Sequence, residues 1–167
     1  MSALPLPLTI REIDAHGFER AWPVFRDVVA RGDTYAYAPD ITLDEARALW
    51  TTSPARCFVA ERGAQVVGLY LLKPNQPDLG DHVANAGFMV AAEARGQGIA
   101  STLCTHAMAQ ARAAGFTAMQ FNYVVASNTG AIALWQRHGF DIVGRVPGAF
   151  RHATLGPTDI LVMHRTL

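Results

Sequence analysis

The sequence predicts a mixed α/β fold in which helices pack against a single sheet. Three observations support this class: the order of the predicted elements is β-α-α-β-β-β-α-β-α-β-β, two apolar strands form a hairpin early in the chain, and helices separate the later strands. Because strands and helices do not alternate regularly, a doubly wound sheet is not expected. The length of 167 residues predicts one domain spanning 1–167.

The first half of the chain is predicted to contain three strands and two helices. Apolar residues recur at helical spacing from Phe18 to Val29, and this first helix should end near Gly32. Thr42 and Glu45 have the spacing of a capping box, which predicts that the second helix begins there. The predicted strands cover residues 9–13, 57–61 and 66–72, and the last two flank a short turn.

The second half is predicted to contain two helices and four strands. A long helix should end at Gly115, and a shorter one at Gly139, because glycine commonly follows the last helical residue. The predicted helices cover 98–114 and 128–138, and the predicted strands cover 82–90, 116–125, 140–146 and 158–165.

Composition and charge exclude several classes of function. The 14 basic and 14 acidic residues balance, so nothing favours a nucleic-acid or membrane-surface partner. No apolar stretch approaches the roughly 18 residues of a membrane span. Cys57 and Cys104 lack metal-ligand spacing, as do the histidines, so we expect no metal site. Reduced thiols are the simplest interpretation, which favours a cytoplasmic location.

The segment from Arg95 to Ala100 has the composition of an anion-binding turn. Gly96 and Gly98 permit tight backbone angles and close approach of a ligand. The turn opens directly into the long helix, whose first N–H groups have no intrahelical partner and carry the positive end of the helix dipole. A flexible connection between a strand and a helix is about as common for a Gly-x-Gly motif alone.

This turn and a later segment together resemble the GCN5-related N-acetyltransferase (GNAT) family. The first signature of that family is matched by Arg95, Gly98 and Ala100. The second is an Asn, a helix with Ala and a Leu-aromatic pair, and then Gly-Phe, which corresponds to residues 128–140 here. The resemblance covers nearly the whole chain and implies a splayed GNAT-type sheet and an acetyl-CoA-dependent N-acetyltransferase.

The resemblance also implies roles for individual residues. The backbone of the turn would bind the pyrophosphate of acetyl-CoA, the strand end would pair with pantetheine, and the Val90 N–H would polarise the thioester carbonyl. Asn128 would bind the cofactor arm, although its position also fits a simple helix N-cap. The implied cofactor-binding residues are Met89, Val90, Arg95, Gly96, Gln97, Gly98, Ile99, Ala100 and Asn128.

Trp135 departs from the family pattern. Many members carry Tyr at this position, where it is thought to protonate the departing thiolate, and Trp cannot supply such a proton. We therefore interpret Trp135 as a core aromatic residue on the apolar face of its helix. Glu93 is one candidate to accept the proton of the amine, but a water held by polar side chains is favoured over it. A covalent acetyl-cysteine intermediate is not expected.

Two asparagines on neighbouring predicted strands indicate a polar substrate pocket. Asn85 and Asn122 lie in apolar strands, where an amide needs hydrogen-bonding partners, and a satisfied structural pair is the alternative. Their surroundings resemble a yeast-type subgroup that N-acetylates proline analogues such as azetidine-2-carboxylate. This resemblance implies that Asn85 and Asn122 bind and activate the acceptor. The remaining implied contacts are Phe88 beside them and Thr34, Tyr35 and Tyr37 at the rim.

The sequence therefore predicts transfer of acetyl to the amine of a small amino acid or an analogue. Two alternatives stay open: acetylation of a protein N-terminus or lysine, which needs a more open groove, and a non-catalytic CoA-binding sensor. The missing proton donor at Trp135 keeps the sensor under consideration. A homodimer is expected only by analogy with the family.

Overall fold

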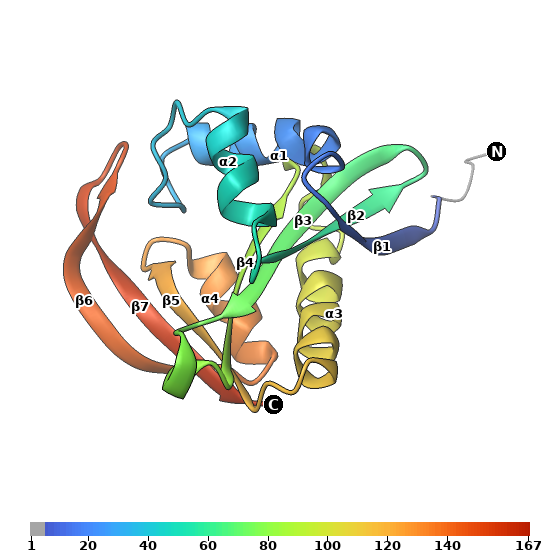
Figure 1. Cartoon of the computed structure of the whole chain (residues 1–167). Helices are drawn as coiled ribbons and strands as arrows, with labels where there is room; N and C mark the ends of the chain where they lie inside the picture. Colours follow the sequence, from blue (N-terminus) through green and yellow to red (C-terminus); the bar gives the residue numbers. More distant parts are fainter. Residues whose placement is uncertain (1–5) are drawn as a thin grey trace.

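The computed structural model describes residues 6–167, so the first five residues of the predicted domain lie outside it. Its elements follow the predicted order (Figure 1). The strands are β1 Leu8–Ile13, β2 Arg56–Arg62, β3 Gln65–Pro74, β4 Val83–Val90, β5 Ala118–Val125, β6 Asp141–His152 and β7 Gly156–Thr166. The helices are α1 Phe18–Ala30, α2 Leu43–Thr51, α3 Ile99–Ala113 and α4 Thr129–Arg137, with short 3-10 helices at Asp78–Gly80 and Ala92–Ala94.

All seven strands form one sheet in the order β1-β2-β3-β4-β5-β7-β6. Neighbouring strands run antiparallel except β4 and β5, which run parallel. This parallel pairing is short: it joins Val83, Ala84 and Asn85 of β4 to residues 118–120 of β5. Beyond Asn85 the two strands diverge. The expected splayed, mixed α/β sheet is therefore confirmed.

Helices cover both sides of the sheet, with α1 and α2 together on one side and α3 and α4 on the other (Figure 1). Helix α3 approaches the sheet closely at Gly68 of β3. A Cβ at this position would lie 3.1 Å from the side chain of Leu103 and 3.2 Å from that of Ile99, both on α3. Glycine therefore lets the helix and the strand come into contact at the centre of the core.

The predicted capping box at the start of α2 is confirmed. The Thr42 hydroxyl accepts a hydrogen bond from the Glu45 N–H at 3.3 Å, and the Glu45 carboxylate accepts one from the Thr42 N–H at 2.8 Å. Two N–H groups that the helix cannot satisfy are thereby bonded. The capping box fixes where the long connection between α1 and α2 ends.

Strand β6 is longer than the sequence pattern predicted. It continues to His152, whereas the expected strand ended at residue 146. Pro147 and Gly148 interrupt the alternation there, and the pairing with β7 shifts between Val146 and Phe150. The Asp159 carboxylate bridges the irregular stretch, because it accepts hydrogen bonds from the Gly148 N–H at 2.8 Å and from Arg145 at 2.6 Å. A β-bulge, not a strand end, thus explains the two turn-forming residues.

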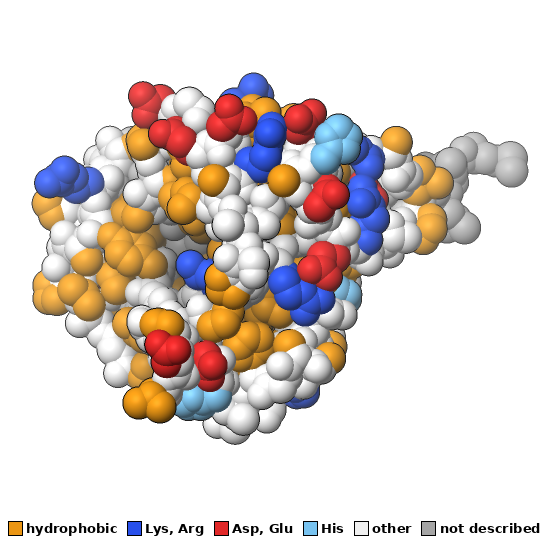
Figure 2. All heavy atoms as spheres, viewed as in Figure 1, with side chains coloured by type: hydrophobic (Ala, Val, Ile, Leu, Met, Phe, Trp, Pro, Cys, Tyr) orange, Lys and Arg blue, Asp and Glu red, His pale blue; other side chains and the backbone are white. Residues whose placement is uncertain are grey.

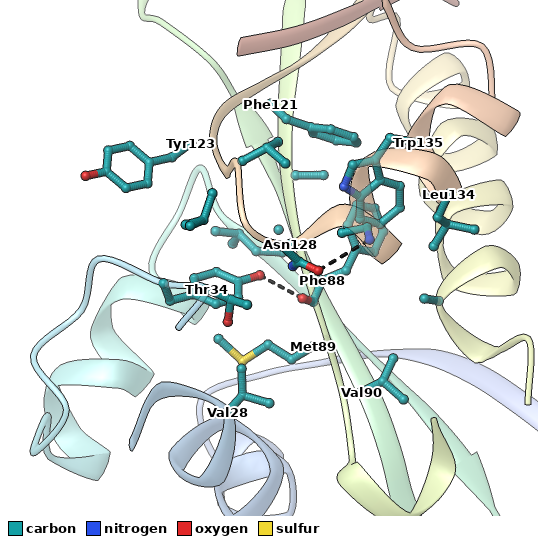
Figure 3. Close-up of a pocket in the computed structure, with 18 of the residues that line it drawn as sticks. Val28, Thr34, Phe88, Met89, Val90, Phe121, Tyr123, Asn128, Leu134 and Trp135 are labelled. Carbon is teal, nitrogen blue, oxygen red and sulfur yellow. Dashed lines mark hydrogen bonds between the residues drawn. The ribbon is translucent and has the colours of Figure 1, made fainter. Parts of the chain in front are cut away.

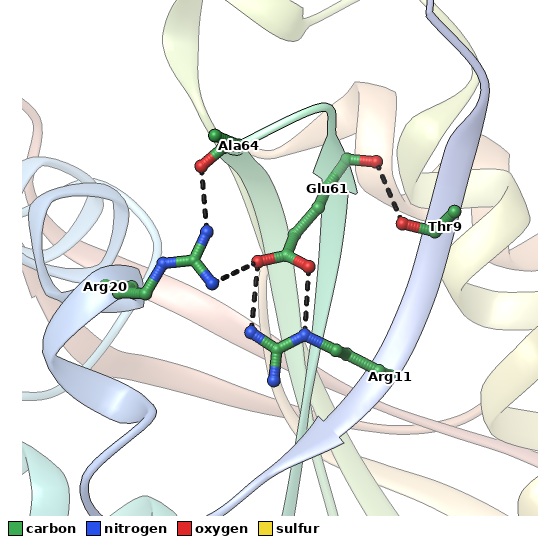
Figure 4. A network of polar contacts seen from close by, with 5 residues as sticks. All are labelled: Thr9, Arg11, Arg20, Glu61 and Ala64. Atoms are coloured by element: carbon green, nitrogen blue, oxygen red, sulfur yellow. Dashed lines mark hydrogen bonds and ion pairs between the residues drawn. The ribbon is translucent and has the colours of Figure 1, made fainter.

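A network of charged side chains joins β1, β2 and α1 (Figure 4). The Glu61 side chain on β2 is buried, and Arg11 of β1 donates two hydrogen bonds to its oxygens, at 2.9 and 3.1 Å. Arg20 of α1 lies 2.9 Å from the same carboxylate and also donates to the Ala64 carbonyl. Hydrogen bonding to Arg11 is the main cause that lowers the pKa of Glu61, and the charge of Arg20 adds to it.

Candidate active site

A cleft of about 760 Å³ opens where β4 and β5 diverge (Figure 3). Its wall is built by the connection between α1 and α2, by β3, β4 and β5, by the turn before α3 and by α4. Most residues that the sequence implicated lie on this wall: Thr34, Tyr35, Tyr37, Asn85, Phe88, Met89, Val90, Arg95, Gly96, Ala100, Asn122 and Asn128. The turn residues Gln97, Gly98 and Ile99 do not line it.

The turn before α3 has the open backbone geometry that its glycines predicted. Gly96 and Gly98 have φ angles of +72° and +77°, in the left-handed region, and Gly98 is the N-cap of α3. Within residues 6–167, no atom beyond the adjoining residues lies within 4 Å of the point where a Cβ of either glycine would sit. The start of α3 is therefore accessible to a ligand, and its first N–H groups are available to an anion.

Gln97 and Ile99, which do not line the cleft, hold the turn in place. The Gln97 side chain donates to the Glu93 carbonyl at 3.1 Å and accepts a hydrogen bond from Arg62. Ile99 is 2% exposed and belongs to the main core. These contacts hold the middle of the turn against β2 and the preceding 3-10 helix, and the start of α3 against the core. Glu93 itself accepts from Gln65 and lies outside the cleft, so it is poorly placed as a base in this site.

The edge of β4 presents free backbone groups to the cleft. The Ala91 N–H donates to the Val67 carbonyl of β3 at 2.9 Å. In an antiparallel ladder, backbone groups point alternately toward and away from the partner strand, so the Val90 N–H points away from β3, toward the gap beside β5. The Phe88 carbonyl points the same way and accepts a hydrogen bond from Tyr35 at 2.8 Å (Figure 3).

Two stacked tyrosines from the connection between α1 and α2 line the cleft. The rings of Tyr35 and Tyr37 lie 5.7 Å apart and are nearly parallel, and the Tyr37 hydroxyl accepts a hydrogen bond from Trp50. Burial raises the pKa of both phenols, so they stay neutral hydrogen-bonding groups at ordinary pH. Gly87 permits this arrangement, because a Cβ there would lie 3.1 Å from the Tyr35 hydroxyl.

Asn85 and Asn122 both line the cleft, but the structure records no hydrogen bond between them. The Asn85 side chain donates to the Gln120 carbonyl at 3.0 Å. The Asn122 side chain accepts from the Gln120 amide at 2.9 Å and donates to Asn75 at 2.6 Å. Each amide is therefore held in place by a neighbouring polar group while its residue faces the cleft. The two interpretations of these asparagines, structural and substrate-binding, are compatible.

Asn128 and Trp135 flank the cleft from α4. The Asn128 side chain caps the helix, because its oxygen accepts the Ala131 N–H at 3.3 Å (Figure 3). Trp135 is 8% exposed and packs against Phe88 and Phe121, with ring centroids at 5.0 and 5.1 Å. The tryptophan is a core aromatic residue, as its helix position predicted, and part of its surface also lines the cleft.

Neither cysteine is suited to nucleophilic catalysis. Cys57 and Cys104 are free, buried thiols, and burial raises the pKa of each to about 12. A thiol with this pKa supplies almost no thiolate at neutral pH. Within residues 6–167 no cluster of His, Cys, Asp and Glu side chains could hold a metal ion. No helix of that part of the chain is long and apolar enough to cross a membrane.

Three charged residues on the cleft wall were not predicted from the sequence: Arg31, Asp33 and Lys73. Asp33 is the only carboxylate among the residues described along the wall. One of its oxygens lies 3.5 Å from Arg31, whereas the other is buried and makes no hydrogen bond within residues 6–167, as is also true of the Thr34 hydroxyl. Arg31 and Asp33 adjoin the aromatic loop in the sequence, but charged residues at such positions are ordinary surface choices, so they gave no distinctive signal.

The β6–β7 hairpin closes over the same connection. The Ala153 N–H at the hairpin tip donates to the Gly32 carbonyl at 2.9 Å, which joins the tip to the loop before Asp33. Figure 2 shows the charged side chains of this face gathered mainly over α1 and α2, whereas hydrophobic side chains gather over the β6–β7 half.

Comparisons with known proteins agree on one family. The family model described as "Acetyltransferase (GNAT) family" matches residues 18–140. The N-acetyltransferase aca1 of Schizosaccharomyces pombe is 35% identical over 52% of this chain, which spans only 41% of that protein. A GCN5-related N-acetyltransferase from Kribbella flavida is 44% identical, with a TM-score of 0.89 over 96% of this chain and 98% of that one. A phosphinothricin acetyltransferase from Sinorhizobium meliloti, solved with acetyl-CoA, is 20% identical with a TM-score of 0.84 over 96% and 88% of the two chains, which shows the fold.

Proposed function

This chain belongs to the acetyltransferase (GNAT) family, and we propose that it transfers an acetyl group from acetyl-CoA directly to the amine of a small amino acid or an analogue. The observation that carries the proposal is the cleft. Residues of the open glycine turn, the free backbone edge of β4, and Asn85 and Asn122 all line it, which supports the proposal. These are the parts that acetyl transfer from a CoA thioester requires.

The cofactor end of the cleft is assigned to the start of α3. The N–H groups from Gln97 to Ala100 would bind the pyrophosphate, and Arg95 on the wall adds a positive charge. The open space at Gly96 and Gly98 supports this role, because a ligand can approach the backbone there. Gln97, Gly98 and Ile99 would contribute through their backbone only.

The transfer step is assigned to the free edge of β4. Pantetheine would pair with Met89 and Val90, and the Val90 N–H would donate to the carbonyl oxygen as negative charge develops on it. The amine nitrogen would bond to the carbonyl carbon while the carbon–sulfur bond breaks. Asn128 would bind the pantetheine arm through its amide nitrogen, because its oxygen is occupied by the helix cap.

Two protons must move during this transfer. We propose that Asp33 accepts the proton of the amine, directly or through one water, because it is the carboxylate on the described wall and has a buried oxygen without a hydrogen bond. Trp135 cannot protonate the thiolate, so water would do so. This loss is tolerable, since a thiol with a pKa near 8.5 is already a fair leaving group.

The acceptor end of the cleft favours a small molecule over a protein. The stacked Tyr35 and Tyr37 line it, and the hydrogen bond from Ala153 to Gly32 joins the hairpin tip to the same loop. A protein N-terminus or lysine would have to enter between these two segments. Asn85, Phe88 and Asn122 would contact the acceptor, as in the yeast-type subgroup that acetylates azetidine-2-carboxylate. Homodimerisation and a cytoplasmic location remain expectations.

One assay separates the three candidate functions. Release of CoA thiol from acetyl-CoA is measured across a panel of free amino acids, proline analogues, amines and peptides. We expect turnover with one or more small amino acids and with no peptide longer than a few residues. Turnover with peptides alone would favour a protein acetyltransferase. Binding of acetyl-CoA without thiol release for any acceptor would favour the sensor and overturn the proposal.

A further inference from the structure

Lys73 is the only lysine in the chain, and its side chain lines the cleft. It lies near the end of β3, directly opposite Asn85 on β4. Directly opposed residues of an antiparallel pair project to the same face of the sheet, so the ammonium group and the Asn85 amide share one side of the cleft. Both residues are half-buried. A charged group in such a place is costly unless it meets a partner.

No carboxylate in the described part of the chain forms an ion pair with Lys73. The recorded ion pairs of residues 6–167 all involve arginines. Asp33, the carboxylate of the described cleft wall, lies 3.5 Å from Arg31. At this end of the cleft, Lys73 is therefore a cation whose counter-charge the described chain does not supply.

The position of Lys73 separates it from the anion-binding turn. On β3 it lies five residues from Gly68, which pairs with Val90, and five residues of strand cover about 17 Å. On β4, Asn85 lies three residues from Phe88, or about 10 Å along the strand. The Lys73 side chain, with its four-carbon stem, can span part of the distance between Asn85 and Phe88. The anion-binding turn follows the other end of β4, after Val90, so Lys73 lies on the side of Val90 away from the pyrophosphate site.

We infer that Lys73 forms an anion subsite that binds the carboxylate of the acceptor. The inference rests on the proposed acetyl transfer and narrows its acceptors to amino acids with a free carboxylate. In an α-amino acid the amine and the carboxylate share one carbon. Binding of the carboxylate by Lys73, with Asn85 beside it, holds the amine on the side of the cleft where the Val90 N–H is free. The same subsite disfavours peptides whose first residue has an amide in place of the carboxylate.

The experiment compares each accepted amino acid with its own primary amide. The quantity measured is the ratio of kcat/KM for the free acid to kcat/KM for the amide, in the wild type and in Lys73→Met, which keeps the length but not the charge. The free acid and the amide differ in amine basicity, and this difference cancels when the two ratios are divided. We expect the ratio to fall about 10- to 100-fold in the variant, mainly through KM, in keeping with the strength of a charge-assisted hydrogen bond.

Two further variants keep the result interpretable. Lys73→Arg should retain most of the preference for the free acid, because the charge is kept. Arg112→Met removes a positive charge from the exposed end of α3, far from the cleft wall, and should leave the ratio unchanged. The affinity for acetyl-CoA, measured by calorimetry, should be the same in Lys73→Met as in the wild type.

Failure of this inference is distinguishable from failure of the proposed function. If the wild type acetylates amino acids and their amides equally well, or Lys73→Met keeps the wild-type ratio, the carboxylate subsite is wrong while acetyl transfer stands. A loss of acetyl-CoA affinity in Lys73→Met would assign the lysine to the cofactor and would also overturn the inference. Absence of turnover with every small amine in the wild type would instead remove the proposed function.

Discussion

Two carboxylates differ in how their oxygens are satisfied: Glu61 is buried, and Asp33 is half-buried with one buried oxygen. Glu61 receives hydrogen bonds or ion pairs from Arg11 and Arg20 at 2.9 to 3.1 Å, so both of its oxygens are satisfied (Figure 4). Asp33 has only Arg31 at 3.5 Å, and its other oxygen is buried without a hydrogen bond in the described chain. The first carboxylate joins three elements of the fold, whereas the second lines the cleft.

The contrast suggests a division between groups that stabilise the fold and groups that we propose bind a ligand. Leaving a buried polar atom without a partner costs about 1–3 kcal/mol, so such atoms are rare in stable interiors. Three of them, on Arg31, Asp33 and Thr34, belong to residues of the cleft wall. We therefore expect substitutions in the Glu61 network to alter stability, and substitutions in the cleft to alter binding and turnover.

The largest effect is expected at the anion-binding turn. Asp and Asn both tolerate the left-handed backbone of Gly98, have nearly the same shape and differ in charge. Gly98→Asp should weaken acetyl-CoA binding on the order of 100-fold relative to Gly98→Asn, because a carboxylate would face the pyrophosphate. Calorimetry measures both dissociation constants, and thermal melting shows whether the two variants are equally folded. Equal affinities of the two variants for acetyl-CoA would show that the pyrophosphate does not bind at the start of α3.

Asp33→Asn tests the unsatisfied carboxylate. We expect kcat to fall by about 100-fold, a typical contribution of a general base, while the free energy of unfolding changes by at most about 1 kcal/mol. Steady-state kinetics measure kcat at pH 7, and chemical denaturation measures the stability of the same variant. A stability loss as large as that of Glu61→Gln would show that Asp33 stabilises the fold as much as Glu61 does.

Glu61→Gln tests the carboxylate whose two oxygens both have arginine partners. Loss of charge-assisted hydrogen bonds to Arg11 and Arg20 should lower the free energy of unfolding by about 1–3 kcal/mol at pH 7, and kcat should change little. Chemical denaturation measures the loss. A variant as stable as the wild type would show that this network contributes specificity of packing only.

Comparison of the wild type with Glu61→Gln also predicts how stability depends on pH. The folded-state pKa of Glu61 is lowered, mainly by its hydrogen bonds to Arg11, so its stabilising effect is fully present above the unfolded value near 4.3. This effect is lost as pH falls through the folded pKa. The stability difference between wild type and Glu61→Gln should therefore be constant above about pH 5 and narrow below pH 4. A difference that grows in acid would contradict the assignment.

The smallest effect is expected at Thr34. Valine has the shape of threonine without the buried hydroxyl, which lacks a hydrogen bond in the described chain. Thr34→Val should leave the protein equally stable or up to about 1 kcal/mol more stable, because a buried polar atom is removed. It should raise KM for the acceptor several-fold if the hydroxyl contacts it. A clear loss of stability would mean that the hydroxyl is satisfied in the folded protein.

Much of the fold followed from local patterns. Helical spacing from Phe18 onward, the capping box at Thr42 and the glycine after α3 located their elements within a few residues. Strand β6 was predicted too short because Pro147 and Gly148 have the composition of a strand end. The pairing with β7 and the bonds to Asp159 keep the strand intact there. A β-bulge depends on the partner strand, so one strand's pattern does not reveal it.

The residues of the candidate site also divide into those that the sequence pattern revealed and those that it did not. Gly96, Gly98, Asn85 and Asn122 stand out because glycines in a turn and amides in apolar strands are unusual choices. Arg31, Asp33 and Lys73 do not stand out, since charged residues in loops and at strand ends are ordinary surface choices. Glu93 looked like a candidate base because it follows β4 closely, but its side chain bonds to Gln65, outside the cleft.

By itself, the sequence determined the element order, the family and the open glycine turn before α3, because each depends on residues close together in the chain. Only the tertiary structure decided which side chains share the cleft. Lys73 and Asn85 come together through the register of β3 and β4, and the Val90 N–H is free because β5 leaves β4 after Asn85. Register and divergence arise from packing between distant segments, and no local pattern records them.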